Sequence, residues 1–182
     1  TDDPIISKVA SSHGAKVINR PADLARDDSP EWLSWKHAIK WVENKYDNFD
    51  IFLSLPPTSP LRSKIDVENC LKSISDKSDV IVGITKSSRS PWFNMVKKNK
   101  NKSLSILMDT KKRINNRQDS PDTFDLTTIA YVATPDFIKK SNGVFDGKVF
   151  GVEIPPERAI DIDTKFDFEI AEYLINKNKQ KI

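Results

Sequence analysis

Two continuous apolar segments with a helical pattern between them constrain the fold of this chain more than any other feature. These segments, residues 50–55 (DIFLSL) and 79–85 (DVIVGIT), are typical of strands buried on both faces of a parallel sheet. Residues 64–75 between them carry apolar side chains at helical spacing. This order predicts a β-α-β unit with a right-handed crossover, and hence an open α/β sheet.

Weaker signals extend this alternation of helices and strands in both directions. Further helices are expected over residues 4–12 and 28–46, from residue 135, and from residue 164. Further strands or strand ends are expected over residues 16–19, 127–133, 149–154 and 159–163. The expected helix-capping residues, in chain order, are Asp2 or Asp3, Asp28 or Ser29, and Thr164 in a capping box with Asp167.

The middle of the chain departs from the alternation. Residues 93–96 and 104–108 flank a tip rich in Lys and Asn, which predicts an antiparallel ribbon. Residues 109–125 are polar and irregular. A long irregular stretch inside a compact domain is usually functional or exchanged with a partner.

The composition is that of a globular protein with a mild positive charge. The 182 residues suit one domain, and 29 Lys and Arg against 26 Asp and Glu leave a net charge of +3. The densest basic segment, residues 97–102, alternates Lys with Asn and favours a solvated hairpin tip over a nucleic-acid site. We therefore expect no nucleic-acid partner.

Export and membrane signals are not found in this sequence. No apolar run approaches the ~20 residues that span a bilayer, and the first residues, TDDP, lack the features of a signal peptide. The single cysteine, Cys70, has no partner for an internal disulfide. We expect a cytoplasmic protein without a membrane partner.

Two strand ends carry residues suited to chemistry, because ligands of open α/β sheets bind at the carboxyl ends of the strands. A rigid loop with three prolines follows residues 50–55, and its Thr58, Ser59 and Arg62 could bind an anionic ligand. A purely structural alternative has Ser59 as the cap of the next helix.

The second strand end holds two carboxylates, Asp161 and Asp163. In an extended strand they would share one face with their Cα atoms ~6–7 Å apart. Such a pair beside a helix N-terminus could hold Mg²⁺ with waters and substrate phosphates. In the alternative reading, one carboxylate caps the helix and the other is solvated.

Four motifs together resemble those of one family, the acylneuraminate cytidylyltransferases. Residues 57–62 (PTSPLR) match a loop of that family, and residues 20–25 (RPADLA) resemble its RPAELA segment. Arg117-Gln118-Asp119 resembles its RQD loop, and residues 159–172 resemble its closing pattern SIDID…D…AE. The motifs occur in the family's order over nearly the whole chain.

The resemblance implies a fold and a reaction. The fold is a three-layer Rossmann-like nucleotide-diphospho-sugar transferase fold, formed by a single domain of residues 1–182. An antiparallel dimerisation arm at about residues 90–125 would reach a second copy in a homodimer. The reaction activates a bacterial nonulosonic acid of the sialic, legionaminic or pseudaminic type with CTP, giving the CMP-sugar and pyrophosphate.

The resemblance also implies roles for particular residues. Asp161 and Asp163 would hold Mg²⁺ and serve catalysis. The other expected assignments are Arg20 and Asp28 to the nucleotide, Thr58, Ser59 and Arg62 to the floor of the sugar pocket, and Arg117 and Gln118 to the sugar acid. For Arg62, a structural role is the alternative to contact with the sugar.

Three departures from the family pattern bear on the substrate. Pro56 stands where the family usually has Gln, residues 125–129 lack the Arg of an RPNGA segment, and residues 30–32 lack a Ser near the base. These changes favour legionaminic or pseudaminic acid over neuraminic acid.

A fourth departure concerns the nucleotide. The family opens with a Gly-rich, basic loop for the triphosphate, whereas this chain begins at TDD, which resembles a later segment. We therefore expect an N-terminally truncated domain that could be inactive by itself. The alternatives are a non-catalytic oligomerisation or interaction module and a nucleotidyltransferase that uses another base.

Overall fold

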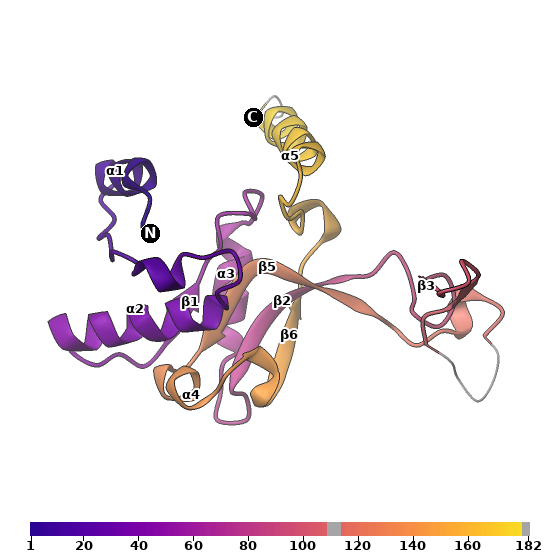
Figure 1. The fold of residues 1–182 in the computed structure, drawn as a ribbon, viewed down its shortest axis with the longest axis horizontal. Coiled ribbons are helices and arrows are strands. Elements are labelled where there is room, and N and C mark those ends of the chain that lie inside the picture. The colour runs from indigo at the N-terminus through magenta and orange to yellow at the C-terminus, as the bar shows by residue number, and fades with distance from the viewer. Residues whose placement is uncertain (109–113, 180–182) are drawn as a thin grey trace. The chain divides into compact units, whose positions relative to one another are not determined.

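The computed structural model describes residues 1–108 and 114–179 as two compact units (Figure 1). The first unit consists of Thr1–Ser54, Ile74–Ile81 and Val132–Phe150. The second consists of Leu55–Ser73, Val82–Tyr131 and Gly151–Ile182. The α/β class predicted from the sequence is confirmed, because helices and a four-stranded sheet alternate along the chain.

The helices of the first unit are α1 (Pro4–Ser12), α2 (Glu31–Lys45) and α4 (Pro135–Lys140). The unit also contains the 3₁₀ turns η1 (Ala22–Leu24) and η3 (Val144–Asp146). Asp3 caps α1 as expected, since its carboxylate accepts the backbone N–H groups of Ile5 and Ile6 at 2.7 and 2.8 Å.

The expected cap of α2 is wrong. The N-cap position is taken by Pro30, and no side chain caps the helix. Asp28 lies too early for this role, and its carboxylate binds the Arg26 guanidinium at 2.8 and 2.9 Å instead. A strand predicted at residues 16–19 is also absent, and those residues have no regular secondary structure.

Aromatic side chains of α2 form the core of the first unit. Trp32 and Trp35 are buried, and the Trp32 ring meets Phe137 of α4 edge-on at 6.0 Å. The indole N–H of Trp32 donates to the Ser141 carbonyl oxygen at 2.9 Å, which satisfies its only polar group. Trp35 packs on Phe52 at 5.4 Å, which anchors strand β1.

The sheet has the strand order β1-β5-β2-β6. These strands are β1 (Phe52–Ser54), β5 (Phe124–Ala133), β2 (Val80–Lys86) and β6 (Val149–Glu153). The first four residues of β2 are buried, as expected for a strand covered on both faces, whereas β1 is only half-buried. This difference in burial follows from the strand order, since β1 lies at one end of the sheet beside β5.

Strands β2 and β5 approach closely at Gly83. A Cβ atom built there would lie 2.6 Å from Thr127 Oγ1 and 3.2 Å from the Ile129 Cβ. Distances below 3.0 Å are essentially never seen for a real Cβ. Glycine is therefore needed at this position so that the two strands can pair.

The second unit contains α3 (Lys64–Ser73), α5 (Lys165–Lys179) and an arm (Figure 1). The remaining pieces, which are short, are η2 (Arg117–Asp119), β3 (Val96–Lys98), β4 (Leu104–Ile106) and η4 (Pro156–Arg158). The expected ribbon is confirmed, because β3 and β4 pair antiparallel with Lys97 opposite Ser105.

The arm leaves the sheet at the end of β2 and returns to it at the start of β5. The chain after β2 runs beside the chain before β5, where the Ser87 N–H donates to the Thr123 carbonyl oxygen at 2.9 Å (Figure 1). Within the expected irregular stretch, residues 109–113 lie outside the described residues. Among the residues that are described, no helix has the length and apolar character required to cross a membrane.

Candidate functional site

The 57–62 loop is held on strand β5 by its own polar side chains. The hydroxyls of Thr58 and Ser59 both contact Thr128 Oγ1, at 3.2 and 2.5 Å. One nitrogen of the Arg62 guanidinium, Nη2, donates to the carbonyl oxygens of Pro56 and Thr128. The segment that matched a family motif is therefore a fixed platform rather than a free loop.

Ser59 does not cap the helix that follows it. It is buried, with 2% of its surface exposed. The cap of α3 is Ser63, whose N–H and hydroxyl donate to Asp66 Oδ2 at 2.9 and 2.7 Å. This is a capping box, so the structural alternative for Ser59 is wrong.

Arg62 is half-buried and keeps one buried donor without a partner among the described residues. Burial lowers the pKa of the Arg62 guanidinium below its ordinary value. Its Nε atom is buried and has no hydrogen-bond partner among the described residues. The Nη2 bonds to backbone carbonyls fit a structural role for Arg62.

The 159–163 segment lies directly against the 57–62 loop. The Ile162 N–H donates to the Thr58 carbonyl oxygen at 2.9 Å. The strand expected here is not formed, because η4 ends at Arg158 and its C-cap, Ala159, has φ −92° and ψ 14°. One backbone hydrogen bond nevertheless joins the two predicted motifs within the second unit.

The two carboxylates of this segment are not occupied by helix capping. Thr164 and Asp167 form the capping box of α5, with the Thr164 N–H and hydroxyl 2.8 and 2.7 Å from Asp167 Oδ2. Asp161 Oδ1 is buried and unpartnered in the described part of the chain. Asp163 is exposed. The alternative in which one of this pair caps the helix is therefore wrong.

A buried carboxylate oxygen without a partner is costly. A cation next to Asp161 would remove that cost, so the observation fits a metal ligand. No group of three or more His, Cys, Asp or Glu side chains suited to a metal occurs among the described residues. A metal here would draw its remaining ligands from water or a substrate.

Arg20 and Asp28 lie in the first unit. Arg20 forms an ion pair with Asp2 at 2.6 Å, and its hydrogen bond holds the pKa of Asp2 below the ordinary value. The Arg20 N–H also donates to the Thr1 carbonyl oxygen. Asp28 is exposed and paired with Arg26. Each of the two nucleotide-binding candidates therefore has a partner in its own unit.

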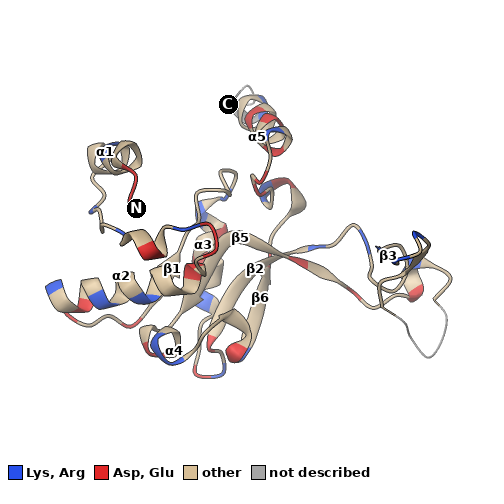
Figure 2. Cartoon of the chain, viewed as in Figure 1, with Lys and Arg blue, Asp and Glu red and all other residues tan. Residues whose placement is uncertain are grey.

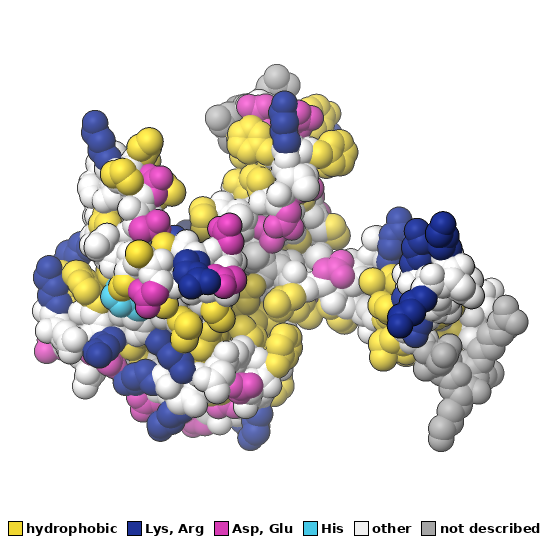
Figure 3. All heavy atoms as spheres, viewed as in Figure 1, with side chains coloured by type: hydrophobic (Ala, Val, Ile, Leu, Met, Phe, Trp, Pro, Cys, Tyr) yellow, Lys and Arg dark blue, Asp and Glu magenta, His cyan; other side chains and the backbone are white. Residues whose placement is uncertain are grey.

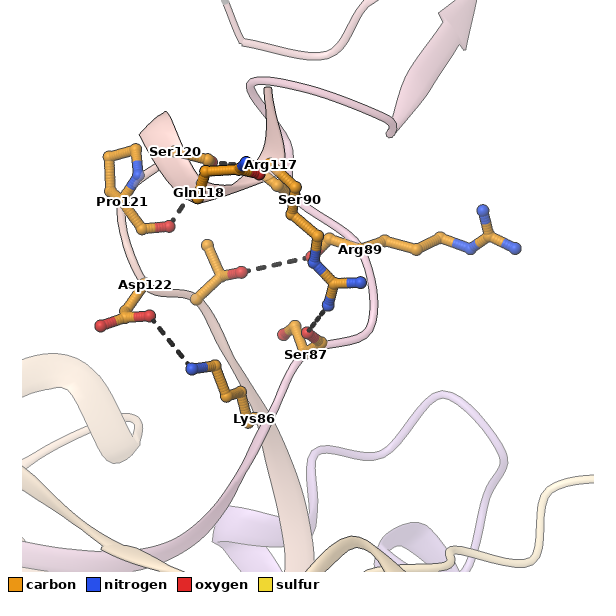
Figure 4. Close-up of a pocket in the computed structure, with 10 residues that line it drawn as sticks. Lys86, Ser87, Arg89, Ser90, Arg117, Gln118, Ser120, Pro121 and Asp122 are labelled. Atoms are coloured by element: carbon orange, nitrogen blue, oxygen red, sulfur yellow. Dashed lines mark hydrogen bonds and ion pairs between the residues drawn. The ribbon is translucent and has the colours of Figure 1, made fainter. Parts of the chain in front are cut away.

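A pocket of about 280 Å³ lies at the base of the arm and includes Arg117 and Gln118 (Figure 4). Arg117 Nη2 donates to the Ser87 carbonyl oxygen at 3.2 Å, which ties η2 to the segment after β2. Lys86 pairs with Asp122 at 3.4 Å across the pocket. The other lining residues are Ser87, Arg89, Ser90, Ser120, Pro121 and Thr123.

Hydroxyl, amide and cationic groups line this pocket together with the carboxylate of Asp122. Because the cationic side chains outnumber this one carboxylate, the pocket suits a polar anion. Figure 4 shows the Arg89 side chain directed away from the other lining side chains. Sequence reasoning found Arg117 and Gln118 but missed Lys86 and Ser87. The available signal was their position at the carboxyl end of β2, where a site is expected in an α/β sheet.

Known proteins similar to this chain include sugar-acid cytidylyltransferases. No model of a protein family matches it. It is 30% identical over 180 residues to the CMP-N,N'-diacetyllegionaminic acid synthase of Campylobacter jejuni, covering 97% of this chain and 75% of that one. It is 29% identical to the post-translational flagellin modification protein B of Campylobacter coli, covering 99% and 77%.

Two further matches, a more distant relative and a solved structure, are named as a cytidylyltransferase and as a CMP-sugar-acid synthetase. The N-acylneuraminate cytidylyltransferase of Escherichia coli is 25% identical over 185 residues, which are 100% of this chain and 42% of that protein. The structure of CMP:2-keto-3-deoxy-manno-octonic acid synthetase complexed with CTP superposes with a TM-score of 0.61 at 17% identity, covering 98% of this chain and 79% of that one. The latter shows a shared fold.

Proposed function

Because the chain belongs to the acylneuraminate cytidylyltransferase family, we propose that it transfers CMP from CTP to a bacterial nonulosonic acid and releases pyrophosphate. The sugar's anomeric hydroxyl would attack the α-phosphorus of CTP while pyrophosphate leaves. The observation that carries the proposal is the hydrogen bond from the Ile162 N–H to the Thr58 carbonyl oxygen. It joins the two segments that would hold the metal and the sugar acid.

We assign Mg²⁺ to Asp161 and Asp163. The buried, unpartnered Asp161 Oδ1 and the exposed carboxylate of Asp163 suit a hard cation that retains waters. When bound, Mg²⁺ would neutralise the charge of the triphosphate. The two side chains would orient it beside the 57–62 loop.

The same reasoning assigns the other ligand-binding residues. Arg20 and Asp28 would serve the nucleotide, with Arg20 near the cytosine. Thr58 and Ser59, which are held on Thr128, would form the floor of the sugar pocket. Arg62 would support that floor through its backbone hydrogen bonds.

Arg117 and Gln118 would face the sugar acid from the arm pocket. A legionaminic-type acid is the substrate we favour, because one relative is named for that product and Pro56 replaces the Gln typical of the family. Pseudaminic and neuraminic acids are the competing substrates. We place the reaction in the cytoplasm, where nucleoside triphosphates are made.

We further propose that the arm at about residues 90–125 mediates a homodimer. An isolated two-stranded ribbon is marginally stable in water, yet β3 and β4 expose Val96 and Leu104 at 52% and 64%. Figure 3 shows apolar and basic side chains close together on the arm, and Figure 2 marks the positions of Lys and Arg along its ribbon. A second copy of the chain would cover the apolar ones.

The test is pyrophosphate release by the full-length protein with CTP, Mg²⁺ and a panel of nonulosonic acids. We expect turnover with CTP and the highest kcat/KM with a legionaminic-type acid. A preference for another nucleotide would indicate a different nucleotidyltransferase. The absence of turnover with every acid and nucleotide would indicate the alternative, a non-catalytic interaction module.

A further inference from the structure

Asp66 is a buried carboxylate with an unusual number of partners. Only 2% of the residue is exposed. Its Oδ2 accepts hydrogen bonds from the N–H and hydroxyl of Ser63 at the start of α3. Both of its oxygens also accept bonds from Arg158, with Nε at 2.9 Å and Nη2 at 2.8 Å. The bidentate arrangement fixes the orientation of both groups.

The hydrogen bonds between Asp66 and Arg158 favour the charged form of each side chain. Burial by itself would raise the pKa of Asp66, but the hydrogen bonds from Arg158 and Ser63 outweigh it and hold the pKa below 3.8. The hydrogen bond to Asp66 raises the pKa of Arg158. Both groups therefore stay charged at neutral pH, although one is buried.

The pair connects the two segments of the candidate site at a second point. Ser63, which Asp66 binds, directly follows the 57–62 loop, and Arg158 ends η4 three residues before Asp161. The first connection is the Ile162 N–H bond to the Thr58 carbonyl oxygen. Two connections, one on each side of Asp161, hold the backbone around this residue against the 57–62 loop and the start of α3.

We infer that Asp66 and Arg158 are positioning residues, which hold η4 against the start of α3 and thereby set the place of Asp161 beside the 57–62 loop. The inference rests on the proposed function. Residues that orient metal ligands typically change metal affinity or activity by about 10–100-fold when they are replaced. A pair that only stabilised the fold would change the melting temperature without changing metal affinity.

Arg158→Lys in the full-length protein is the central variant, because it keeps the charge but removes the bidentate geometry. Glu68→Gln is the matched control, since Glu68 also lies on α3 and pairs with Lys64 and Lys72 on the exposed side. Mn²⁺ affinity is measured by electron paramagnetic resonance with and without CTP. Deuterium exchange is measured on a peptide covering residues 159–163, together with the melting temperature.

We expect Arg158→Lys to weaken Mn²⁺ binding about 10-fold or more and to speed exchange across residues 159–163. Glu68→Gln should match the wild type in both measurements. Wild-type Mn²⁺ affinity and wild-type exchange in a folded Arg158→Lys variant would overturn the inference. If Arg158→Lys does not fold, Asp66→Asn is measured in the same way and judged by the same outcomes.

Asp161→Asn separates failure of this inference from failure of the proposed function. Wild-type Mn²⁺ affinity in that variant would remove the metal assignment, and exchange across residues 159–163 would then decide the positioning role. Faster exchange in Arg158→Lys would still support that role, and unchanged exchange would overturn it. Loss of Mn²⁺ binding in Asp161→Asn with no effect of Arg158→Lys on affinity or exchange would overturn the inference alone.

Discussion

The Ile162 N–H donates to the Thr58 carbonyl oxygen at 2.9 Å, although 104 positions separate the two residues in the sequence. Thr58 belongs to the loop assigned to the sugar acid, and Ile162 stands between the two carboxylates assigned to the metal. Since both atoms belong to the backbone, the contact does not depend on either side chain. It sets the two segments in a fixed register.

Asp161→Asn is expected to lower the rate of pyrophosphate release by about 100-fold or more, because it removes a charged ligand for the ion that neutralises the triphosphate. Steady-state assays over a range of Mg²⁺ concentrations measure the effect. Thr164→Ala is the control: it removes the cap of α5 and should cost about 1 kcal/mol of stability with most turnover retained. Wild-type turnover in Asp161→Asn would contradict the metal assignment.

Gly83→Ala is expected to destabilise the fold by about 1–3 kcal/mol, because the new Cβ would lie 2.6 Å from Thr127 Oγ1. Urea denaturation measures the change. Gly143→Ala is the matched control, since no atom of the described residues outside its immediate chain neighbours lies within 4 Å of a Cβ built there. The double variant with Thr127→Ala should recover part of the loss, and equal stability of the two glycine variants would count against this close approach.

The stability added by the Asp66–Arg158 pair should depend on pH. The folded-state pKa of Asp66 lies below its ordinary value of 3.8, so its contribution is fully present above that pH and is lost as the pH falls through the folded-state value. Asp66→Asn should therefore cost about 1.5–3 kcal/mol at pH 7, the range for lost hydrogen bonds to a charged group, and progressively less below pH 4. Denaturant titrations of both proteins from pH 7 to pH 3 measure the difference, and a cost independent of pH would contradict the charged pair.

Leu104→Ser on the arm is expected to weaken self-association by about 10-fold, because it removes a 64% exposed apolar side chain from the proposed dimer contact. Sedimentation velocity over a range of protein concentrations measures this. Phe145→Ser, which alters a 74% exposed side chain of η3 in the first unit, is the control. A wild-type protein that remains monomeric at every concentration would argue against the arm as a dimer contact.

Local sequence patterns predicted the elements whose signals are local. The continuous apolar character of residues 80–82 predicted the buried start of β2, and Thr164 with Asp167 predicted the capping box of α5. Where a local pattern failed, a competing contact explains the failure. Asp28 has the chemistry of a helix cap but binds Arg26, and residues 159–163 have a strand-like alternation but follow a 3₁₀ turn.

The motifs of the candidate site were visible in the sequence because each is a short run of particular residue types. PTSPLR and the Asp161–Asp163 pair needed no structure to be noticed. Their relation to each other did need one, as did the contacts that support them. An ion pair such as that of the buried Asp66 with the half-buried Arg158 leaves no periodic signal in a sequence. Taken alone, each of the two residues has the character of an ordinary charged surface residue.

By itself, the sequence determined the α/β class, the family motifs and the residues that could bind a metal and a sugar acid. Tertiary structure alone decided that Thr58 and Ile162 share a hydrogen bond and that Ser59 is buried on Thr128. It also decided that Asp161 keeps an oxygen without a partner in the described part of the chain. The physical reason is that hydrophobic periodicity and capping act within a few residues. Burial and pairing between distant segments exist only once the folded chain has brought them together.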